Sequence, residues 1–558
     1  MKTKRRHIIP TITCLLSLML ISCSEEYLEE SPPHLITAET LYTNYDGFEA
    51  GLNGLYALAR KERQGRSASN YLLADMMMNG TDNLLTNHRD GWSRVAEAWQ
   101  ERNNAFNEEY EYVFEWLYEL INAANTIIIR VRNPELDLAT ISKTHEENRN
   151  RILAEASVLR AWAYRHLAYL WGDVPIVLDE SKGSNIRTDW QRIPVEEVWQ
   201  LVKSDLLFGE KYLDIEPDVE GKLSRGVAQH YLAELYLVLD QPDSALHWAN
   251  MCINTPDYEL INGRYGVKAD EPGVPFMDMF YDGNSNRSEG NTEALWVWQY
   301  EYEAIGGGEN IMRRWHMSRY NDIKIGGVTP LELTVERGGR PRARMSLTQF
   351  AINLYEPGDD RGSSFAIRKF FVLKDENEND TGKADKLPEG YSFGDTIWMD
   401  WSEPITSSTR NRLDWPYSRK WDWANENDVT AARQFNDQIY LRLGETYLLK
   451  AEAQMKLDDL SGAAETMNTL RRRANASEIT AADVTLDFIL DERSRELALE
   501  EHRRYTLLRT GKWLERTARY NTNGGALITE RDRLFPIPQR VIDANLTSEM
   551  SQNPGYNN

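Results

Sequence analysis

One short segment of this chain has the residue order of a hydrolase nucleophile. Residues 390–394, Gly-Tyr-Ser-Phe-Gly, match the pattern G-x-S-x-G, and His502 follows in the order that a Ser–Asp–His triad uses. A serine of this kind sits on a sharp turn between an apolar strand and a helix. Residues 383–389 are polar and residues 395–404 end in proline, so neither flanking element is expected. The sequence therefore predicts no catalysis at Ser392.

A second segment has the spacing of a calcium-binding loop. Positions 1, 3, 5, 7 and 12 of such a loop are held by Asp282, Asn284, Asn286, Ser288 and Glu293. The sharp turn of the loop requires glycine at position 6, where this chain has arginine. An ordinary polar loop is therefore expected, with a calcium site at Asp282, Asn284, Asn286 and Glu293 as the alternative. No two of the nine His lie within five positions of each other, so no other cofactor is predicted.

Large aromatic side chains favour a third kind of chemistry, the binding of sugars. The chain has 17 Trp and 27 Tyr. Sugar rings present C–H faces that stack on aromatic rings, and their hydroxyl groups pair with carboxylate, amide and guanidinium groups. A glycan site therefore needs exposed Trp or Tyr next to Asp, Asn or Arg.

Two regions have this composition, and we predict that together they form the ligand-binding face. The residues are Asp75, Asn83, Trp92 and Trp99 in a loop region at about 65–104, and Trp298, Trp315, Tyr320 and Trp398 in the centre of the chain. Polar neighbours make Trp92, Trp99 and Trp315 the first choices for exposed stacking rings. Trp296 and Trp298 alternate with apolar residues, so in a strand both rings point to one side, which is either the ligand face or the core.

Composition and charge exclude several classes of protein. The 64 Lys and Arg against 87 Asp and Glu give a net charge of −23, which would repel the phosphate backbone of a nucleic acid. Hydrophobic residues make up 41% of the chain and charged residues 27%. These values exclude a disordered, collagen-like or multi-span membrane protein. The sequence predicts a globular body with no nucleic-acid partner.

The N-terminus has the pattern of a bacterial lipoprotein signal. A basic start precedes a mostly apolar stretch over residues 8–22, which is too short to span a membrane. The order Leu-Ile-Ser-Cys at residues 20–23 is that of a lipobox, so we expect a signal peptide over residues 1–22 and acylation of Cys23. Residues 23–36 are then a lipidated tether. After cleavage Cys252 is the one remaining free thiol, so no intramolecular disulfide is expected.

Helical periodicity dominates both ends of the remaining chain. It is clearest over residues 151–172, and it also runs through 105–130, 195–214 and 485–505. Two segments have small residues 12 positions apart across a polar turn, Ala233 and Ala245 in one and Ala451 and Ala463 in the other. This spacing is typical of tetratricopeptide-like helix hairpins. The charged stretch 491–509 has five acidic residues and five Arg, which predicts a salt-bridged helix.

The fold class that follows is mainly α, with a tetratricopeptide-like scaffold interrupted by an irregular segment. We expect the first part of the scaffold over residues 37–261 and the second part, with a C-terminal framework, over 437–558. Between them, residues 262–436 contain Gly-rich turns, polar runs and short alternating stretches, and 8 of the 17 Trp. We expect this insertion to be loops and short strands that form the ligand-binding half.

Several segments of the helical parts resemble the SusD/RagB family of outer-membrane nutrient-binding lipoproteins. They are ILAEASVLRAWAYRHLAYLWGDVPIV at 152–177, SRGVAQHYLAELYLVL at 224–239, IYLRLGETYLLKAEAQ at 439–454, ILDERSRELALEEHRRYTLLRTGKW at 489–513, and LFPIPQRVIDAN with SQNPGY near the end. With the lipobox they span nearly the whole chain in the order of the family. Ser-Glu-Glu at residues 24–26 resembles the acidic export tag of Bacteroidetes surface lipoproteins.

The resemblance implies a surface lipoprotein, anchored in the outer membrane by its lipid, that captures an oligosaccharide or polysaccharide. It implies four tetratricopeptide-like helix pairs and a partner, a TonB-dependent SusC-like transporter to which the glycan is passed. A peptide or glycopeptide receptor of the same fold is the alternative. A hydrolase is the second alternative. A glycosidase needs only two carboxylates at the right separation, but nothing in the sequence selects one pair among the 87 acidic residues. A purely structural scaffold is the third alternative.

Overall fold

The computed structural model describes residues 37–66, 71–88, 94–183, 185–374 and 387–556, and the predicted signal peptide, Cys23 and the tether lie outside them. Helices make up most of the regular structure, so the predicted fold class, mainly α, is confirmed. The longer helices are α3 (Tyr45–Arg60), α6 (Glu108–Arg130), α7 (His145–Trp171), α8 (Val195–Tyr212), α9 (Arg225–Val238), α10 (Pro242–Ile253), α14 (Leu443–Lys456), α15 (Leu460–Arg473), α16 (Leu486–Leu497), α17 (Arg503–Arg509) and α18 (Trp513–Tyr520). The shorter ones are α2 (Ala38–Leu41), α4 (Asp75–Met78), α5 (Trp99–Arg102), α11 (Pro275–Asp278), α12 (Met312–His316), α13 (Gln349–Asn353) and α19 (Gln539–Asp543).

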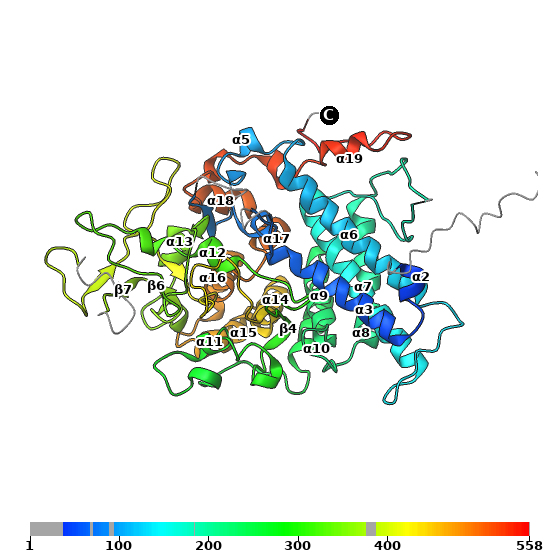
Figure 1. The fold of residues 1–558 in the computed structure, drawn as a ribbon, viewed down its shortest axis with the longest axis horizontal. Coiled ribbons are helices and arrows are strands. Elements are labelled where there is room, and N and C mark those ends of the chain that lie inside the picture. The colour runs from blue at the N-terminus through cyan, green and yellow to red at the C-terminus, as the bar shows by residue number, and fades with distance from the viewer. Residues whose placement is uncertain (1–36, 67–70, 89–93, 184, 375–386, 557–558) are drawn as a thin grey trace, which may run out of the picture.

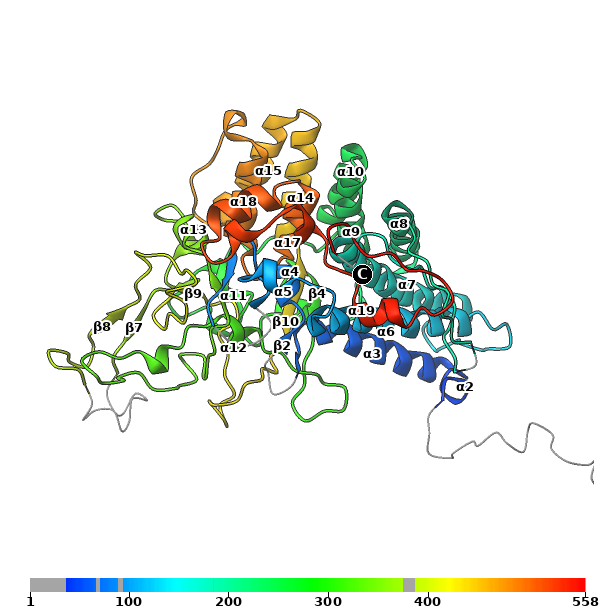
Figure 2. The same ribbon diagram turned by 90° about the horizontal axis from the view of Figure 1, so that it is seen from above.

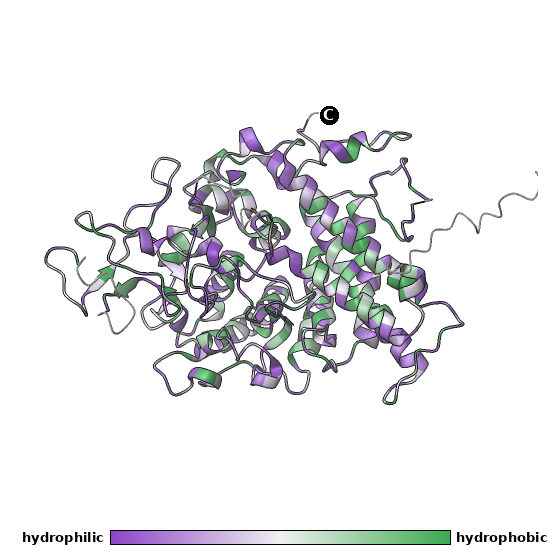
Figure 3. Ribbon diagram, in the orientation of Figure 1, coloured by the Kyte–Doolittle hydropathy of each residue, from purple (hydrophilic) through white to green (hydrophobic). Residues whose placement is uncertain are grey.

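The long helices pack against one another in sequence order. α6 packs on α7, α7 on α8, α8 on α9, α9 on α10, α10 on α14, and α14 on α15. In Figure 1, α3 and α6–α10 form one half of the molecule, and the green and yellow central segment fills much of the other half. Hydrophobic and hydrophilic residues are both present on these helices (Figure 3). Apolar side chains of these helices are buried between neighbouring helices, and α7 also buries charged residues such as Arg160 and Arg165.

The best predicted helix is α7. It begins after Thr144, whose side chain accepts a hydrogen bond from the Glu147 N–H while the Glu147 carboxylate accepts one from the Thr144 N–H. This capping box satisfies backbone groups that the first turn leaves without partners. α7 ends at Gly172, whose φ of 70° lies in the left-handed region that favours glycine. The sequence pattern predicted the end of α7 correctly, but the predicted start at residue 151 is six residues after the observed start at His145.

The two hairpins predicted from alanine spacing are present. α9 and α10 form one, and α14 and α15 form the other. Ala233, Ala245, Ala451 and Ala463 are each at most 1% exposed, so these small side chains let the paired helices approach closely. Asp240 and Asp458, in the two turns, have φ values of 52° and 62°. Both hairpins thus reverse direction through an aspartate in the left-handed region, a conformation that Asp tolerates better than most residues.

The central segment is irregular, as predicted, and its strands pair only in twos. The strands of the whole described chain are β1 (Gly65–Arg66), β2 (Tyr71–Leu72), β3 (Leu84–Thr86), β4 (Ala294–Trp298), β5 (Met345–Leu347), β6 (Ile367–Arg368), β7 (Phe370–Val372), β8 (Thr396–Trp398), β9 (Tyr417–Ser418) and β10 (Gln438–Arg442). All pairings are antiparallel: β1 with β2, β4 with β10, β3 with β5, β6 with β9, and β7 with β8. β10 leads directly into α14, so the β4–β10 pair joins the insertion to the second part of the scaffold.

The prediction of one salt-bridged helix over 491–509 is only partly right. The charges do form ion pairs, but the helix breaks after α16 at Leu499, whose φ is 66°, and resumes as α17. The ion pairs are buried and join these residues to other segments of the chain. Glu496, fully buried, contacts the guanidinium groups of Arg361, Arg442 and Arg473. Because Arg361 belongs to the insertion and Arg473 to α15, this carboxylate links the insertion to the scaffold.

No helix in the described ranges has both the length and the low charge needed to cross a membrane. The apolar side chains gather instead in one large core that includes residues of both halves, with smaller clusters beside it. Trp162, Trp171 and Trp199 of α7 and α8 are buried there, and Trp248 of α10 is partly buried against this core. Cys252 is a free thiol in this core, and burial raises its pKa to about 12. It is therefore neither acidic enough nor exposed enough to react readily.

Candidate functional site

Most of the predicted stacking rings are buried, which contradicts the expectation that they lie on a ligand-binding face. Trp99 and Trp298 are each 2% exposed, and Trp315 and Tyr320 have no exposed surface. Trp99 packs edge to face on Trp513 with ring centroids 5.6 Å apart. Trp298 stacks on Tyr440 at 3.9 Å, and its neighbour Trp296 lies on the same side, so that side of the strand is core. These four rings stabilise the fold and are not accessible to a sugar.

The polar residues predicted for the first loop are also inside the protein. Asp75 is 4% exposed and Asn83 is 1% exposed. Burial raises the pKa of Asp75 to about 7, although a hydrogen bond from Asn79 and the charge of Arg344 oppose this rise. Glu109, also buried, has its pKa raised by burial and then by the charge of Asp75. Asp75 and Glu109 therefore form a pair of buried acids, not a contact surface for ligand hydroxyl groups.

The raised pKa of Asp75 predicts a pH dependence of stability. Between its ordinary pKa of 3.8 and about 7 the folded state holds a proton that the unfolded state has released, so stability falls as pH rises through this range. The loss is on the order of 4 kcal/mol at most. Asp75→Asn, which mimics the protonated acid, should remove much of this loss. Unfolding midpoints of both proteins at pH 5 and pH 8 test it.

Asp270→Asn is the matched control for that experiment, because Asp270 is exposed. It should leave the difference between the two pH values unchanged. If Asp75→Asn and Asp270→Asn showed the same pH dependence as the unaltered protein, the buried acid pair would not be the cause.

Of the remaining predicted rings, one is exposed and one lies outside the described residues. Trp398 is 63% exposed on β8, where its ring contacts Phe370 of β7 at 4.9 Å between centroids. Figure 2 shows β7 and β8 at the far end of the irregular half. Trp92 lies outside the described ranges. A ligand-binding role for Trp398 and for Trp92 stays a prediction.

The residues of the predicted calcium loop are used by the fold. Glu293 is fully buried and its two carboxylate oxygens pair with Arg442 at 2.6 Å and Arg473 at 2.9 Å. The Asn284 side chain bonds to the backbone of residues 267 and 278, and Asn286 donates to Asp437. Two guanidinium groups on the carboxylate that a calcium ion would need oppose cation binding there.

The segment with the serine motif is an exposed turn. The backbone N–H of Ser392 donates to the Asp395 carboxylate at 2.7 Å, and no helix follows in the adjoining described residues. His502 is buried elsewhere, with its Nε2 3.0 Å from Glu62 and its Nδ1 3.3 Å from the Arg165 guanidinium. A guanidinium can only donate, so Nδ1 accepts and Nε2 carries the proton given to Glu62. His502 is therefore a buried structural residue.

His502 also belongs to a group of three side chains whose spacing would admit a metal ion. One ligand atom each from Glu62, His166 and His502 lies within 4.8 Å of the others, and all three residues are buried. His166 donates to or accepts from the Tyr505 hydroxyl at 2.7 Å, and burial lowers its pKa well below the usual value. The proton of His502 on Nε2 is directed at Glu62, and His166 Nε2 is the one ring nitrogen of the group without a hydrogen-bond partner in the described residues, so the group does not present three free lone pairs.

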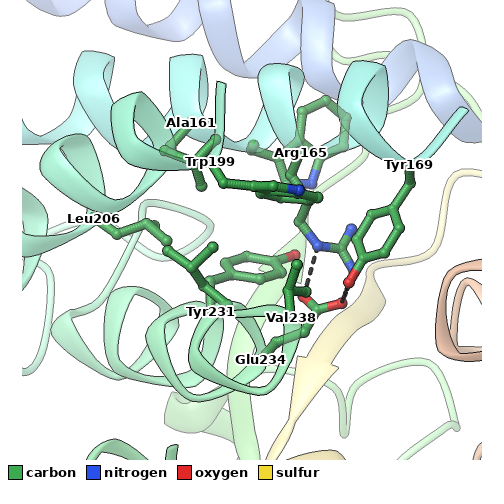
Figure 4. A pocket seen from close by; sticks show the side chains of 11 residues that line it. Ala161, Arg165, Tyr169, Trp199, Leu206, Tyr231, Glu234 and Val238 are labelled. Atoms are coloured by element: carbon green, nitrogen blue, oxygen red, sulfur yellow. Dashed lines mark hydrogen bonds and ion pairs between the residues drawn. The ribbon is translucent and has the colours of Figure 1, made fainter. Parts of the chain in front are cut away.

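A small cavity lies inside the helical scaffold. It is lined by side chains of α7, α8 and α9 (Figure 4), and its volume of about 10 Å³ is room for about one water molecule. Arg165 crosses it to form an ion pair with Glu234 at 2.6 Å, and the Tyr169 hydroxyl donates to the same carboxylate. These groups satisfy one another inside the scaffold. The cavity is a packing detail and is too small for a sugar.

The described residues do contain one partly exposed aromatic group with carboxylates around it, which we call the aromatic cluster. It consists of Tyr302, Trp423 and Phe435. Tyr302 is 55% exposed and meets Phe435 with centroids 4.8 Å apart, and Trp423 meets the same ring at 6.4 Å. The Trp423 indole N–H donates to Asp282 at 3.0 Å. Rings with exposed faces beside fixed carboxylates are the arrangement that a glycan site requires.

Sequence reasoning missed the aromatic cluster because its members are far apart in the chain. Tyr302 and Phe435 are brought together by an antiparallel bridge between Asn310 and Gln434, in which each N–H donates to the other carbonyl. The carboxylate of Glu303 raises the pKa of the Tyr302 hydroxyl, which confirms that the ring sits in acidic surroundings. A Tyr–Glu pair beside the run of three glycines was the only local signal. Loops of the central segment project on the side opposite α10 and α15 (Figure 2).

Comparison with known proteins decides the family. One family model, described as the SusD family, matches residues 297–556. A second, described as starch-binding and associating with the outer membrane, matches residues 26–237. The chain belongs to the SusD family. The resemblance that the helical segments carry is thereby confirmed.

Individual SusD-family proteins resemble the chain over very different lengths. SusD-like protein P25 from Formosa agariphila is 25% identical over 572 aligned residues, which cover 96% of this chain and 98% of that protein. The starch-binding protein SusD of Bacteroides thetaiotaomicron is 36% identical over 119 residues, 21% of each chain. A laminarin-binding SusD-like protein of known structure superimposes with a TM-score of 0.67 at 20% identity, covering 92% of this chain and all of the other.

The segments that carry the SusD resemblance are framework elements in this structure. Residues 152–177 are α7 and the turn after it, 224–239 are α9, and 439–454 are β10 and α14. Residues 489–513 contain α16, α17 and the buried charges between them. A SusD-family scaffold is thus fixed by helix packing and buried ion pairs. The loops that would meet a ligand lie outside these segments.

Proposed function

We propose that this SusD-family protein binds a glycan at the cell surface and passes it, unchanged, to a TonB-dependent SusC-like transporter. The observation that carries the proposal is the family itself, together with relatives whose names state starch binding and laminarin binding. The aromatic cluster supports it, because exposed rings beside carboxylates suit the stacking of sugar rings. Binding without catalysis is favoured, since Ser392 lies on an exposed turn and His502 is buried elsewhere.

Removing one ring of the aromatic cluster should weaken glycan binding without unfolding the protein. Tyr302→Ala removes a ring that is 55% exposed, so little packing is lost. A stacked ring contributes on the order of 1 kcal/mol, which corresponds to several-fold in affinity. The soluble form, residues 24–558, would first be screened on a glycan array, and the ligand found there titrated by calorimetry against both proteins.

Tyr112→Ala is a control, since Tyr112 is a half-buried ring of the helical scaffold away from the loops. Equal affinity for Tyr302→Ala and the unaltered protein would place the site elsewhere. Binding to peptides with no glycan bound would favour the peptide receptor over the glycan receptor.

The anchoring part of the proposal rests on Cys23, and it has its own test. Full processing of a bacterial lipoprotein gives Cys23 three acyl chains, enough for stable anchoring in the outer membrane. Cys23→Ser removes the acylation site and should leave the protein unprocessed or soluble. The measurement is the distribution of the protein between outer-membrane and soluble fractions. If Cys23→Ser still partitioned wholly with the outer membrane, the lipobox would not be the anchor.

A further inference from the structure

One stretch of this acidic protein is strongly basic. Residues 313–344 contain seven Arg and one Lys against three acidic residues, within a chain whose net charge is −23. The stretch begins in α12 and runs through the following loop up to the residue before β5. A local positive charge on a protein that repels anions everywhere else concentrates anions at one place.

Three arginines of this stretch come together, and we call Arg314, Arg340 and Arg342 the arginine cluster. The backbone N–H of Arg342 donates to the Arg314 carbonyl at 2.8 Å, so these two residues are direct neighbours. Arg313 holds the backbone of the third, Arg340, because the Arg313 guanidinium donates to the carbonyls of Gly338 and Arg340. Burial, followed by the charges of Arg340 and Arg342, lowers the pKa of Arg314 to about 10. The three charges therefore repel one another at short range.

Two members of the arginine cluster have no counter-ion in the described part of the chain. Neither Arg314 nor Arg340 is within ion-pair distance of a described carboxylate, and the half-buried Nε of Arg314 has no hydrogen-bond partner there. Some buried arginines elsewhere in the fold pair with a carboxylate, as Arg160 does with Asp205 at 2.8 Å, whereas the fully buried Arg313 donates to backbone carbonyl groups instead. An uncompensated, half-buried guanidinium is costly unless something binds to it. Its donors suit an anion with paired oxygens, such as carboxylate or sulfate.

The arginine cluster adjoins the aromatic cluster through one segment of chain. The Val429 carbonyl accepts a hydrogen bond from the Arg340 N–H, and the Ala431 carbonyl accepts one from the Arg313 guanidinium. Phe435, four residues after Ala431, belongs to the aromatic cluster. Six residues span at most about 20 Å when extended, so one oligosaccharide could contact both groups.

We propose that the glycan bound by this protein is anionic, and that Arg314 and Arg340 bind its carboxylate or sulfate groups while the aromatic cluster stacks on its rings. This inference rests on the proposed glycan-binding function. A neutral glycan would leave two guanidinium groups without partners, whereas an anionic one supplies charge-assisted hydrogen bonds to both. It also explains how a protein of net charge −23 could hold an acidic polymer.

The test compares ligands that differ only in charge. Polygalacturonate and its methyl ester form one pair, and a sulfated galactan and its desulfated form make the other, so the two pairs distinguish carboxylate from sulfate. The soluble protein should bind at least one charged ligand about tenfold more tightly than its neutral counterpart. The preference should shrink as salt is raised from 50 to 500 mM, because salt screens exposed charges. An array of neutral and acidic glycans extends the comparison.

Single substitutions test whether Arg314 and Arg340 bind the charged groups of the ligand. Arg340→Gln changes an exposed side chain and should weaken binding of the charged ligand about tenfold, with little change for any neutral one. Arg314→Gln should act similarly. Arg433→Gln is the matched control, since Arg433 lies on the segment between Ala431 and Phe435 but is paired with Glu309 at 2.8 Å. It should change the affinity less than twofold, and a thermal melt of each variant checks that it is folded.

The outcomes separate this inference from the proposed function. If the array finds only neutral ligands, or if charged and neutral partners bind equally, the inference is overturned and glycan binding stands. If charged ligands are preferred but Arg314→Gln and Arg340→Gln bind them as the unaltered protein does, the assignment to these residues is overturned. If no glycan binds and an acidic peptide such as poly-Glu does, the proposed function fails as well.

Discussion

Glu496→Gln is expected to destabilise the protein by about 3–5 kcal/mol. Glu496 is fully buried, and its carboxylate faces Arg361 at 3.0 Å, Arg442 at 2.6 Å and Arg473. Glutamine would present an N–H₂ group to guanidinium groups that can only donate, and it would leave their charges partly uncompensated. The expected cost is large because three cations lose a shared partner, where an isolated surface pair would lose one.

The pKa of Glu496 supports the same conclusion. Burial alone would raise it, but the charges of Arg473, Arg442 and Arg361 outweigh burial and hold the pKa well below the usual value. A lowered pKa means that this stabilisation is present above the ordinary pKa of about 4.5 and is lost only as pH falls through the lower value of the folded state. The buried ion pairs should therefore withstand mildly acidic conditions.

The matched control is Glu465→Gln, the same substitution in an exposed ion pair. Glu465 pairs with Arg472 at 2.5 Å, with side chains 65% and 43% exposed. A pair of this kind contributes about 0–1 kcal/mol. Urea and thermal unfolding midpoints at neutral pH should therefore drop sharply for Glu496→Gln and hardly at all for Glu465→Gln. Similar midpoints for the two variants would show that the buried network does not hold the insertion to the scaffold.

The helical scaffold could be predicted from the sequence because its signals are local. The end of α7 follows from Gly172, and both hairpins follow from alanines 12 residues apart across a polar turn. Each of these signals involves residues within about one helix hairpin of each other. The break between α16 and α17 could not be predicted in this way, because the buried charges on either side of Leu499 pair with distant residues such as Arg361 and Arg442.

The exposure of the candidate ligand-binding side chains was harder to predict, because exposure in an irregular segment depends on distant partners. Polar neighbours suggested that Trp99 is exposed, yet it packs against Trp513, more than 400 residues later. Conversely, Tyr302 and Phe435 form a partly exposed pair across a gap of 133 residues, which no local pattern indicates. In a helix, period and amphipathicity reveal the buried face. In loops and two-residue strands no such period exists, so composition alone selected side chains that the structure mostly buries.

Trp315→Ala is expected to destabilise the protein by about 3–5 kcal/mol, the cost of emptying a large space in a packed core. The Trp315 ring has no exposed surface, and the Arg344 guanidinium lies over it at 5.1 Å. The backbone adds a hydrogen bond from the Arg344 N–H to the Trp315 carbonyl at 2.7 Å. Alanine would leave both the cavity and an arginine without its aromatic neighbour, so α12 and β5 should lose their contact.

Trp398→Ala provides the comparison that separates a core ring from a surface ring within the same insertion. Trp398 is 63% exposed and contacts mainly Phe370, so its removal should cost less than about 1 kcal/mol. A thermal melt of each variant is the measurement. The sequence made Trp315 a first choice for an exposed stacking ring, whereas the structure buries it in the core. The melting temperature of Trp315→Ala decides between these two roles. A Trp315→Ala protein that melted like the unaltered one, and like Trp398→Ala, would mean that the ring is available to a ligand after all.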